Sequence, residues 1–422
     1  MDLWKEKGWV TVIGVFLAFF MTCVAGVNAE NMSKKKPAPE GAVFTIGHSM
    51  CITGPASDEA AGLQGARDYL SWMNETHGGI HGVPVKLLWA DNKYQVPLAL
   101  NFYRRWKEKG ILCHNTYISG AEVALKDTYA KDKIPCIPST YAPNQIDPPG
   151  WIFNPLCSYA DGLAGAGRWF MEQWKKKGET RRVRLCIIYP DNTYGRAPLK
   201  AKKFLKHIGI DVVGEFVVPW NPVDTVASMY GAMAKKPDFI YLQHHAGGAA
   251  VIFRDMRKAG LLPKTPVIGG WYIMDNTTLK LAPVEGEGVM AVCPYGLPTE
   301  NTPAVKILVD WHEKKHGTRE LESYVYYYPS YIFGILSCEA IKRAYEKVGW
   351  PVTGQDVYNA LVSLKDYDMG GLTDNISFTG TGPKSRRGSS SIRIIRIHDS
   401  KIEPLSDWFS VPLIKVDGSW ID

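Results

Sequence analysis

The chain has 422 residues, of which 45% are hydrophobic and 22% are charged, so it can bury a substantial core. Its length exceeds what one hydrophobic core usually holds, and we therefore expect two domains. The formal net charge is +7, but the basic residues are scattered along the chain rather than gathered in blocks. Nucleic acid is therefore not an expected partner.

An export signal is predicted at the amino terminus. Two lysines precede an apolar run over residues 9–27, and Val27-Asn28-Ala29 offers the small residues that a signal peptidase reads. We expect residues 1–29 to be a signal peptide and 30–42 a linker, so that the mature protein is exported. An uncleaved membrane anchor is one alternative, because the apolar run is long enough to span a bilayer. A lipoprotein start at Cys23 is the other.

The cysteines do not define a disulfide framework. Seven of the eight would remain after removal of the leader, which is an odd number. An oxidising compartment permits disulfides. However, Cys113, Cys136 and Cys186 fall within predicted strands, where buried free thiols are common. The pairing stays open.

The first predicted unit is a strand, a loop and a helix. The apolar run 43–47 leads to the loop Thr53-Gly54-Pro55-Ala56-Ser57, and apolar residues then recur at spacings of three and four over 63–73. A glycine-rich turn at 78–82 leads to a second strand at 85–90.

The order of these motifs resembles the start of a type I periplasmic solute-binding protein. The loop at 53–57, the helix opening Gly62-Leu63-Gln64-Gly65-Ala66 and the turn Gly78-Gly79-Ile80-His81-Gly82 carry the resemblance. It is closest to the branched-chain amino acid (Leu/Ile/Val) binding family that feeds ABC importers. The resemblance implies a periplasmic binding protein and not an enzyme. Such a protein hands a small-molecule ligand to an inner-membrane ABC permease. We expect it to be a monomer.

Strands and helices keep alternating, which predicts parallel sheets covered by helices on both faces. Strands are expected at 111–113, 134–138, 183–189, 212–218, 239–242 and 266–269, with helices at 123–131, 161–177, 197–207, 226–234 and 249–259. Helices follow at 304–316, 331–347 and 354–364, and a hairpin-like end follows at 376–378 and 392–397.

The resemblance implies an α/β fold of two Rossmann-like lobes with parallel sheets, joined by a three-strand hinge. On this basis we expect lobe 1 at 43–156 plus 295–386, lobe 2 at 157–294 plus 387–411, and a C-terminal tail at 412–422. Segments 371–373, 386–389 and 394–397 also resemble the family, particularly its branch for non-amino-acid solutes.

A ligand of such a fold binds beyond the carboxyl ends of the strands. In this sequence the loops expected there carry hydroxyl, aromatic or glycine residues, at 51–57, 117–120, 139–141, 191–195, 243–245 and 270–272. The predicted ligand-binding residues are Ser119, Gly120, Ser139, Thr140, Tyr141, Tyr194, His244, His245, Trp271 and Tyr272. We expect Ser119 to bind a ligand oxygen while Tyr194 and Trp271 close over it from the second lobe.

One departure from the family bears on the ligand. The family's glutamate that neutralises the ligand ammonium falls at Trp271, and the threonine that shares the ammonium falls at Tyr141. An ammonium without a carboxylate in a closed cleft would cost several kcal/mol. We therefore expect an aromatic or aliphatic carboxylate or amide rather than an ordinary α-amino acid. Branched-chain amino acid binding proper, a ligand-sensing receptor subunit and a secreted hydrolase are the alternatives.

His312-Glu313-Lys314-Lys315-His316 matches the H-E-x-x-H pattern of zinc proteases. No third ligand is evident, and we expect both histidines to lie off the buried face of their helix. The segment is therefore predicted to be a solvated helix end without a metal, and His312→Ala is predicted to leave stability unchanged.

Other motifs receive structural interpretations. The tyrosines at 324–328 are expected to serve packing, and Arg386-Arg387 is expected to be a surface loop. His244 and His245 have no nucleophile paired with them in the sequence, so a cleft or packing role is expected rather than catalysis. No P-loop, dinucleotide fingerprint or G-x-S-x-G elbow is present, and no cofactor is expected.

Overall fold

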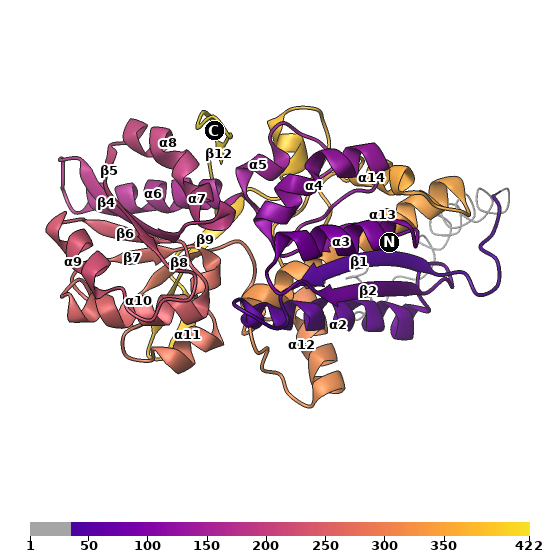
Figure 1. Ribbon diagram of the computed structural model, residues 1–422, viewed down its shortest axis with the longest axis horizontal. Helices are drawn as coiled ribbons and strands as arrows, with labels where there is room; N and C mark the ends of the chain where they lie inside the picture. Colours follow the sequence, from indigo (N-terminus) through magenta and orange to yellow (C-terminus); the bar gives the residue numbers. More distant parts are fainter. Residues whose placement is uncertain (1–34) are drawn as a thin grey trace, which may run out of the picture.

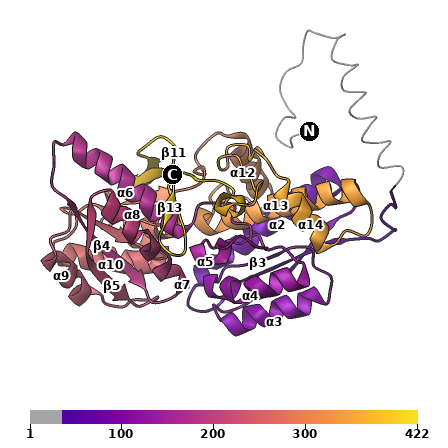
Figure 2. The same cartoon turned by 90° about the horizontal axis from the view of Figure 1, so that it is seen from above.

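The computed structural model describes residues 35–422. The predicted signal peptide at 1–29 lies outside the described residues. Two bodies lie side by side, and each is built from a β-sheet with helices on its faces (Figures 1 and 2). The predicted α/β fold with parallel sheets is therefore confirmed.

The first lobe contains a three-stranded parallel sheet with the order β2-β1-β3. Its strands are β1 (Phe44–Met50), β2 (Val85–Asp91) and β3 (His114–Thr116). Helices α3 (Val96–Lys107) and α4 (Ser119–Asp132) pack together, α5 (Pro143–Ile146) follows, and α2 (Ala60–His77) lies on the other side of the sheet (Figure 1). The apolar residues at helical spacing on α2 are buried, as predicted.

The second lobe contains an eight-stranded sheet with the order β10-β9-β8-β7-β6-β4-β5, and β11 pairs with β9. The parallel strands are β4 (Val183–Pro190), β5 (Ile210–Val218), β6 (Phe239–Leu242), β7 (Val267–Gly269) and β8 (Met290–Cys293). Its helices are α6 (Tyr159–Lys176), α7 (Thr193–Arg196), α8 (Lys202–His207), α9 (Val226–Ala234), α10 (Ala246–Lys258) and α11 (Asn276–Leu281).

The chain passes between the lobes three times. After β8 it returns to the first lobe as α12 (Pro303–His316), α13 (Tyr324–Val348) and α14 (Gly354–Val362), and α13 packs along α2. It then rejoins the second sheet as the antiparallel strands β9 (Ser391–His398), β10 (Lys401–Pro404) and β11 (Phe409–Ser410). The end of the chain pairs β12 (Leu413–Ile414) with β13 (Trp420–Ile421) beside α6. We propose that the lobes have the boundaries expected from the sequence, 43–156 plus 295–386 for lobe 1 and 157–294 plus 387–411 for lobe 2.

Some predicted elements differ from the structure. The apolar residues 111–113 precede β3 rather than form it, although Leu112 N donates to Thr45 O at 2.8 Å alongside β1. The segment 134–138 makes single bridges at Cys136 instead of a strand, and 376–378 makes one bridge at Ile376. The predicted helix at 197–207 is a 3₁₀ turn (Ala197–Ala201) followed by α8.

Two further differences concern element starts and omissions. Helix α13 begins at Tyr324 rather than at residue 331, although it contains Pro329. Pro329 is the sixth residue of this helix, so its missing N–H forfeits one intrahelical hydrogen bond. Strand β8 was not predicted, although it is as long as β6, which was.

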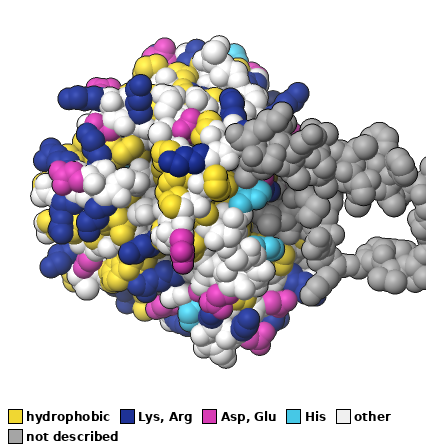
Figure 3. Space-filling view, turned by 90° about the vertical axis from the view of Figure 1, so that its right-hand side faces the viewer, with side chains coloured by type: hydrophobic (Ala, Val, Ile, Leu, Met, Phe, Trp, Pro, Cys, Tyr) yellow, Lys and Arg dark blue, Asp and Glu magenta, His cyan; other side chains and the backbone are white. Residues whose placement is uncertain are grey.

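The cysteines are free thiols. All seven cysteines in the described part of the chain are unpaired and buried, which answers the question of pairing that the sequence left open. On the face of the molecule seen in Figure 3, acidic side chains lie among the basic ones, consistent with scattered charge.

The prediction of a surface loop at Arg386-Arg387 was wrong, because both side chains are buried. Arg387 Nε donates to Asp161 Oδ2 at 3.2 Å, and its Nη2 donates to Ile414 O at 2.5 Å. Asp161 lies in the first turn of α6 and also accepts from Ser158 N at 2.7 Å and Ile414 N at 2.6 Å. A buried carboxylate requires such partners, so the arginine is drawn inward.

The prediction that both histidines of the H-E-x-x-H segment lie off the buried face was also wrong. His312 is only 7% exposed, and its Nδ1 donates to Asp68 Oδ2 on α2 at 2.9 Å. Helix α12 packs against α2, and the buried Asp68 carboxylate requires hydrogen-bond donors there. Because His312 is buried and bonded to Asp68, this arrangement does not support the expectation that His312→Ala leaves stability unchanged.

Replacing Arg387 tests the buried ion pair. Arg387→Met should lower the free energy of unfolding by about 3–5 kcal/mol, because Asp161 would stay buried without its cation. The matched control is Arg182→Met, since the Arg182–Asp211 pair is about half exposed and such pairs contribute at most about 1 kcal/mol. Chemical denaturation measures both values, and equal losses in the two variants would contradict this account.

Candidate functional site

The loops at the carboxyl ends of strands from both sheets meet at a small cavity between the lobes. Its volume is about 20 Å³, which is close to the space that one water molecule needs. The residues lining the cavity are Glu59, Tyr94, Tyr117, Ser119, Thr140, Tyr159, Tyr194, Trp220, His245, Tyr272 and Tyr326.

On the first lobe, the amino end of α4 supplies a polar group to the cavity. Ser119 is 3% exposed, and its Oγ has no hydrogen-bond partner within residues 35–422. Thr140 donates from Oγ1 to Glu122 Oε2 at 2.5 Å and accepts from Gln145 Nε2 at 2.8 Å. Thr140 is therefore already engaged, whereas the Ser119 hydroxyl is available to a ligand.

Glu59 is the acidic residue that lines the cavity. It ends a short 3₁₀ helix (Ser57–Glu59) directly after the loop at 53–57, is 3% exposed, and accepts from Cys51 N at 3.1 Å. Burial, together with the nearby Asp58 carboxylate, raises the pKa of Glu59 well above its usual value. This shift favours the neutral form of Glu59, which can donate as well as accept a hydrogen bond.

Aromatic rings form most of the cavity wall and meet across the two lobes. Trp220 stacks on Tyr94 of the first lobe, with ring centroids 4.9 Å apart, and on His245 of its own lobe at 4.6 Å. Tyr272 of the second lobe stacks on Tyr326 of α13 at 5.0 Å. These contacts give the site a largely apolar wall with few polar groups, which is typical of a small-molecule site.

Hydrogen bonds also join the lobes around the cavity. Tyr272 Oη donates to Ser139 O at 2.7 Å, and Trp220 Nε1 donates to Pro55 O at 3.0 Å. His245 Nδ1 lies 3.2 Å from Asp58 Oδ2. The described conformation is therefore a closed one, in which side chains of both lobes fill the cleft.

Five of the ten predicted residues line the cavity, namely Ser119, Thr140, Tyr194, His245 and Tyr272. Tyr194 Oη donates to His244 O at 2.8 Å, which holds its ring against the cavity. The geometry of Ser119, Tyr194 and Tyr272 thus brings together residues that the sequence placed at separate strand ends.

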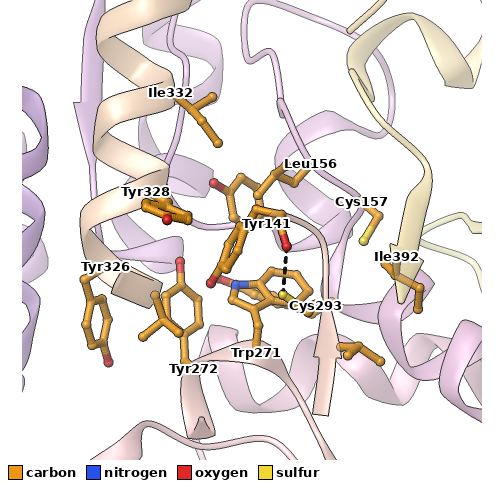
Figure 4. Packing of buried hydrophobic residues seen from close by; sticks show 14 of the residues in the cluster. Tyr141, Leu156, Cys157, Trp271, Tyr272, Cys293, Tyr326, Tyr328, Ile332 and Ile392 are labelled. Carbon is orange, nitrogen blue, oxygen red and sulfur yellow. Dashed lines mark hydrogen bonds between the residues drawn. The ribbon is translucent and has the colours of Figure 1, made fainter. Parts of the chain in front are cut away.

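The other five predicted residues lie beside or behind the cavity wall. Trp271 is buried between Tyr141 and Tyr159, with ring centroids at 5.8 and 5.2 Å, and Figure 4 shows its contact with Tyr141. His244 Nε2 donates to Pro219 O at 3.1 Å, and burial lowers the pKa of His244 to about 3, so the ring is neutral.

Ser139 and Gly120 contribute in other ways. The Ser139 side chain bonds to Asn115, and its carbonyl is the group that accepts from Tyr272. Gly120 lies where α4 meets the second lobe, since a Cβ there would stand 3.4 Å from Thr193 Oγ1. Their roles as ligand contacts stay predictions.

Six residues that line the cavity were not predicted from the sequence. Tyr94 and Trp220 follow the ends of β2 and β5, so applying the strand-end rule to those loops would have found them. Tyr117 stands in a loop that was considered. Tyr159 and Tyr326 come from helices and Glu59 from a 3₁₀ turn, and no strand-end signal marks them.

Comparisons with known proteins agree with this architecture. Residues 43–401 match the family described as periplasmic binding protein. No curated protein matches the sequence. A branched chain amino acid ABC transporter protein from Thermus thermophilus with bound valine is similar, with 24% identity, a TM-score of 0.79, and coverage of 87% of this chain and 96% of that chain.

Two further solved structures share the fold. A fatty acid ABC transporter substrate-binding protein from Thermomonospora curvata has 21% identity and a TM-score of 0.76, with coverage of 89% of this chain and 95% of that one. A leucine binding protein from Thermotoga maritima has 17% identity and a TM-score of 0.70, with coverage of 89% and 99%. The chain therefore belongs to the periplasmic binding protein family, whose members bind small-molecule ligands for ABC transporters and are not enzymes.

Proposed function

We propose that this protein captures a small organic ligand between its lobes and delivers it to an ABC importer of the branched-chain amino acid type. The observation that carries the proposal is the cavity between the lobes, where strand-end loops of both sheets converge on an unpartnered Ser119 hydroxyl. Closure buries the ligand, and the closed form differs in shape from the open one, so a permease can distinguish them.

Export belongs to the same proposal. Members of the family are periplasmic, and residues 1–29 carry the predicted signal peptide. Between residues 35 and 422, no helix has the length and apolar character needed to cross a bilayer. We expect Edman sequencing of the exported protein to start near Glu30, and an intact Met1 in the membrane fraction would contradict cleavage.

The charge of the cavity wall narrows the ligand class. The wall contains Glu59 but no lysine or arginine, so a ligand carboxylate could pair with no cationic side chain except His245. A neutral amide fits better, because the neutral form of Glu59, which burial favours, can donate to its carbonyl oxygen and Ser119 Oγ can accept from its N–H. We propose an amide-like head on an aromatic or aliphatic body. An aromatic or aliphatic carboxylate is the second candidate, because the Ser119 hydroxyl can also donate to it.

The exclusion of ordinary α-amino acids needs one amendment. The argument from the sequence assumed a cleft without a carboxylate, whereas Glu59 lies in the cavity wall. Glu59 is on the first lobe, however, and its raised pKa means that binding an ammonium there first requires ionising a buried acid. We therefore keep the proposal that α-amino acids are not the ligand.

A ligand screen tests this function. Matched amides, carboxylates and α-amino acids with the same carbon skeletons should be compared by thermal shift and calorimetric titration. At equal ligand concentrations, we expect the amides to stabilise the protein most. A ligand at a hundredfold excess over its Kd stabilises the folded protein by about 2.7 kcal/mol. Stabilisation by leucine and valine alone would overturn the proposed ligand class, and no response in any series would leave the binding function without support.

Glu59→Gln distinguishes the ligand classes by charge. The substitution keeps a neutral side chain that can donate and accept, so the affinity for an amide should change by less than about threefold. Where Glu59 is neutral, a carboxylate should also bind both proteins with similar affinity. Above the raised pKa of Glu59, a carboxylate should bind the variant more tightly, while an ammonium ligand should lose about 1.5–3 kcal/mol in the variant, or roughly ten- to a hundredfold. Calorimetry at several pH values adds a second readout. The wild type should lose amide affinity as pH rises through the raised pKa of Glu59, and the variant should not.

The matched control is Ser119→Ala, which removes a hydroxyl without changing charge. It should weaken every bound ligand by about 0.5–1.5 kcal/mol, roughly two- to twelvefold, with no new dependence on pH. A pH-dependent loss in this control would show that the titration does not report Glu59.

A further inference from the structure

A cluster of three metal-ligating groups lies in the first lobe, apart from the residues that line the cavity. It consists of Asp68 on α2 with His312 and His316 on α12, and one ligand atom from each lies within 4.8 Å of the others. The sequence analysis dismissed the two histidines because no third ligand was evident. The fold supplies that ligand from a residue more than 240 positions away in the chain.

The three groups point at one another. Asp68 Oδ2 lies 2.9 Å from His312 Nδ1, and Asp68 Oδ1 lies 2.9 Å from His316 Nε2. In a tetrahedral zinc site, ligand atoms at about 2.0–2.1 Å from the metal are roughly 3.3 Å apart. Each pair would therefore separate by only about 0.4 Å to admit an ion.

The charge of the cluster suits a divalent cation. The Asp68 carboxylate faces His312 Nδ1 and His316 Nε2 at 2.9 Å each, so two nitrogen atoms and a carboxylate converge on one point. Tyr327 Oη donates to Asp68 Oδ2 at 2.7 Å and so orients it from outside the cluster, as second-shell groups do in metal sites.

The hydrogen bonds around His316 converge on Asp68 Oδ1. Gln64 Nε2 lies 2.9 Å from His316 Nε2 and 2.6 Å from Asp68 Oδ1. Gln64 and His316 can both donate to Asp68 Oδ1, so that oxygen attracts donors from both helices. A cation between His316 and Asp68 would take the place of the His316 proton and accept a lone pair from each.

We propose that Asp68, His312 and His316 form a binding site for a first-row divalent transition metal such as Zn²⁺. Two imidazoles and one carboxylate are the donor set that zinc and its neighbours prefer. The His316 side chain is 31% exposed, so water can complete the coordination shell. The ion would fasten α12 to α2 within the first lobe.

The site is a binding site rather than a hydrolytic centre. In zinc proteases the glutamate of H-E-x-x-H acts as a general base beside the metal. Here Glu313 Oε2 accepts from Arg319 Nη1 at 2.6 Å, and its side chain is about half exposed on the outer surface. Glu313 is therefore directed to an ion pair, and the hydrolase alternative gains no support from this cluster.

Zinc binding by the full mature chain tests the proposal. After dialysis against Zn²⁺, the wild type should retain one equivalent per chain, measured by elemental analysis, and Zn²⁺ should raise its Tm. His316→Gln should keep a hydrogen bond to Asp68 but lose a metal ligand, so its zinc affinity should fall by roughly tenfold or more, the scale at which even second-shell losses act. Its Tm without zinc should stay close to that of the wild type.

The matched control is His398→Gln. His398 belongs to the more exposed group Glu287, His398 and Asp399, which also holds three ligand atoms within reach of one another. This control should bind zinc as the wild type does. Three results would each overturn the proposal. They are no zinc binding by the wild type, an unchanged zinc affinity in His316→Gln, and a loss of zinc binding in His398→Gln. Amide binding to the cavity should be the same in all three proteins, so failure here leaves the proposed function intact.

Discussion

The buried ion pair between Asp161 and Arg387 organises the junction between the lobes. Arg387 belongs to the third passage of the chain between the lobes, and its neighbours pair with the first passage, since Gly388 N donates to Asn154 O at 2.7 Å. Asp161 completes the capping box of α6, the first helix of the second lobe, and also accepts from the C-terminal tail at Ile414. One carboxylate therefore joins the third passage, the start of α6 and the tail.

Closure of the cleft depends on the contacts that join the two lobes around the cavity. Those contacts are a few hydrogen bonds, such as Tyr272 to Ser139 and Trp220 to Pro55, and stacked rings. A neutral hydrogen bond contributes only about 0.5–1.5 kcal/mol net, so they favour the closed form modestly. A ligand that contacts both lobes adds differential binding energy of similar size, and this is sufficient to shift the population between open and closed forms.

The sequence predicted the repeating parts of the fold well because their signals are local. The apolar spacing over 63–73 and the short apolar runs of β4 and β6 identify their elements within a few residues. The candidate site was half predicted, since the rule of strand ends finds the right loops but not which side chain faces inward. Neighbouring residues point in different directions, so Tyr272 reaches the cavity while Trp271 packs behind it.

Two errors, at Arg387 and His312, share one physical cause, which is a buried carboxylate whose partner is distant in the chain. Arg387 was assigned to the surface because Asp161 lies 226 positions away, and His312 because Asp68 lies 244 positions away. No local pattern reports such a pair, although a buried acid must have one.

The two buried carboxylates differ in what their partners allow. Arginine offers no lone pair, so it cannot bind a metal beside Asp161. Imidazole can bind a metal through the nitrogen that contacts the carboxylate. The tie at Asp68 can therefore respond to its surroundings, and its place between α2 and α12, away from the lining of the cavity, directs that response to the stability of the first lobe rather than to ligand affinity.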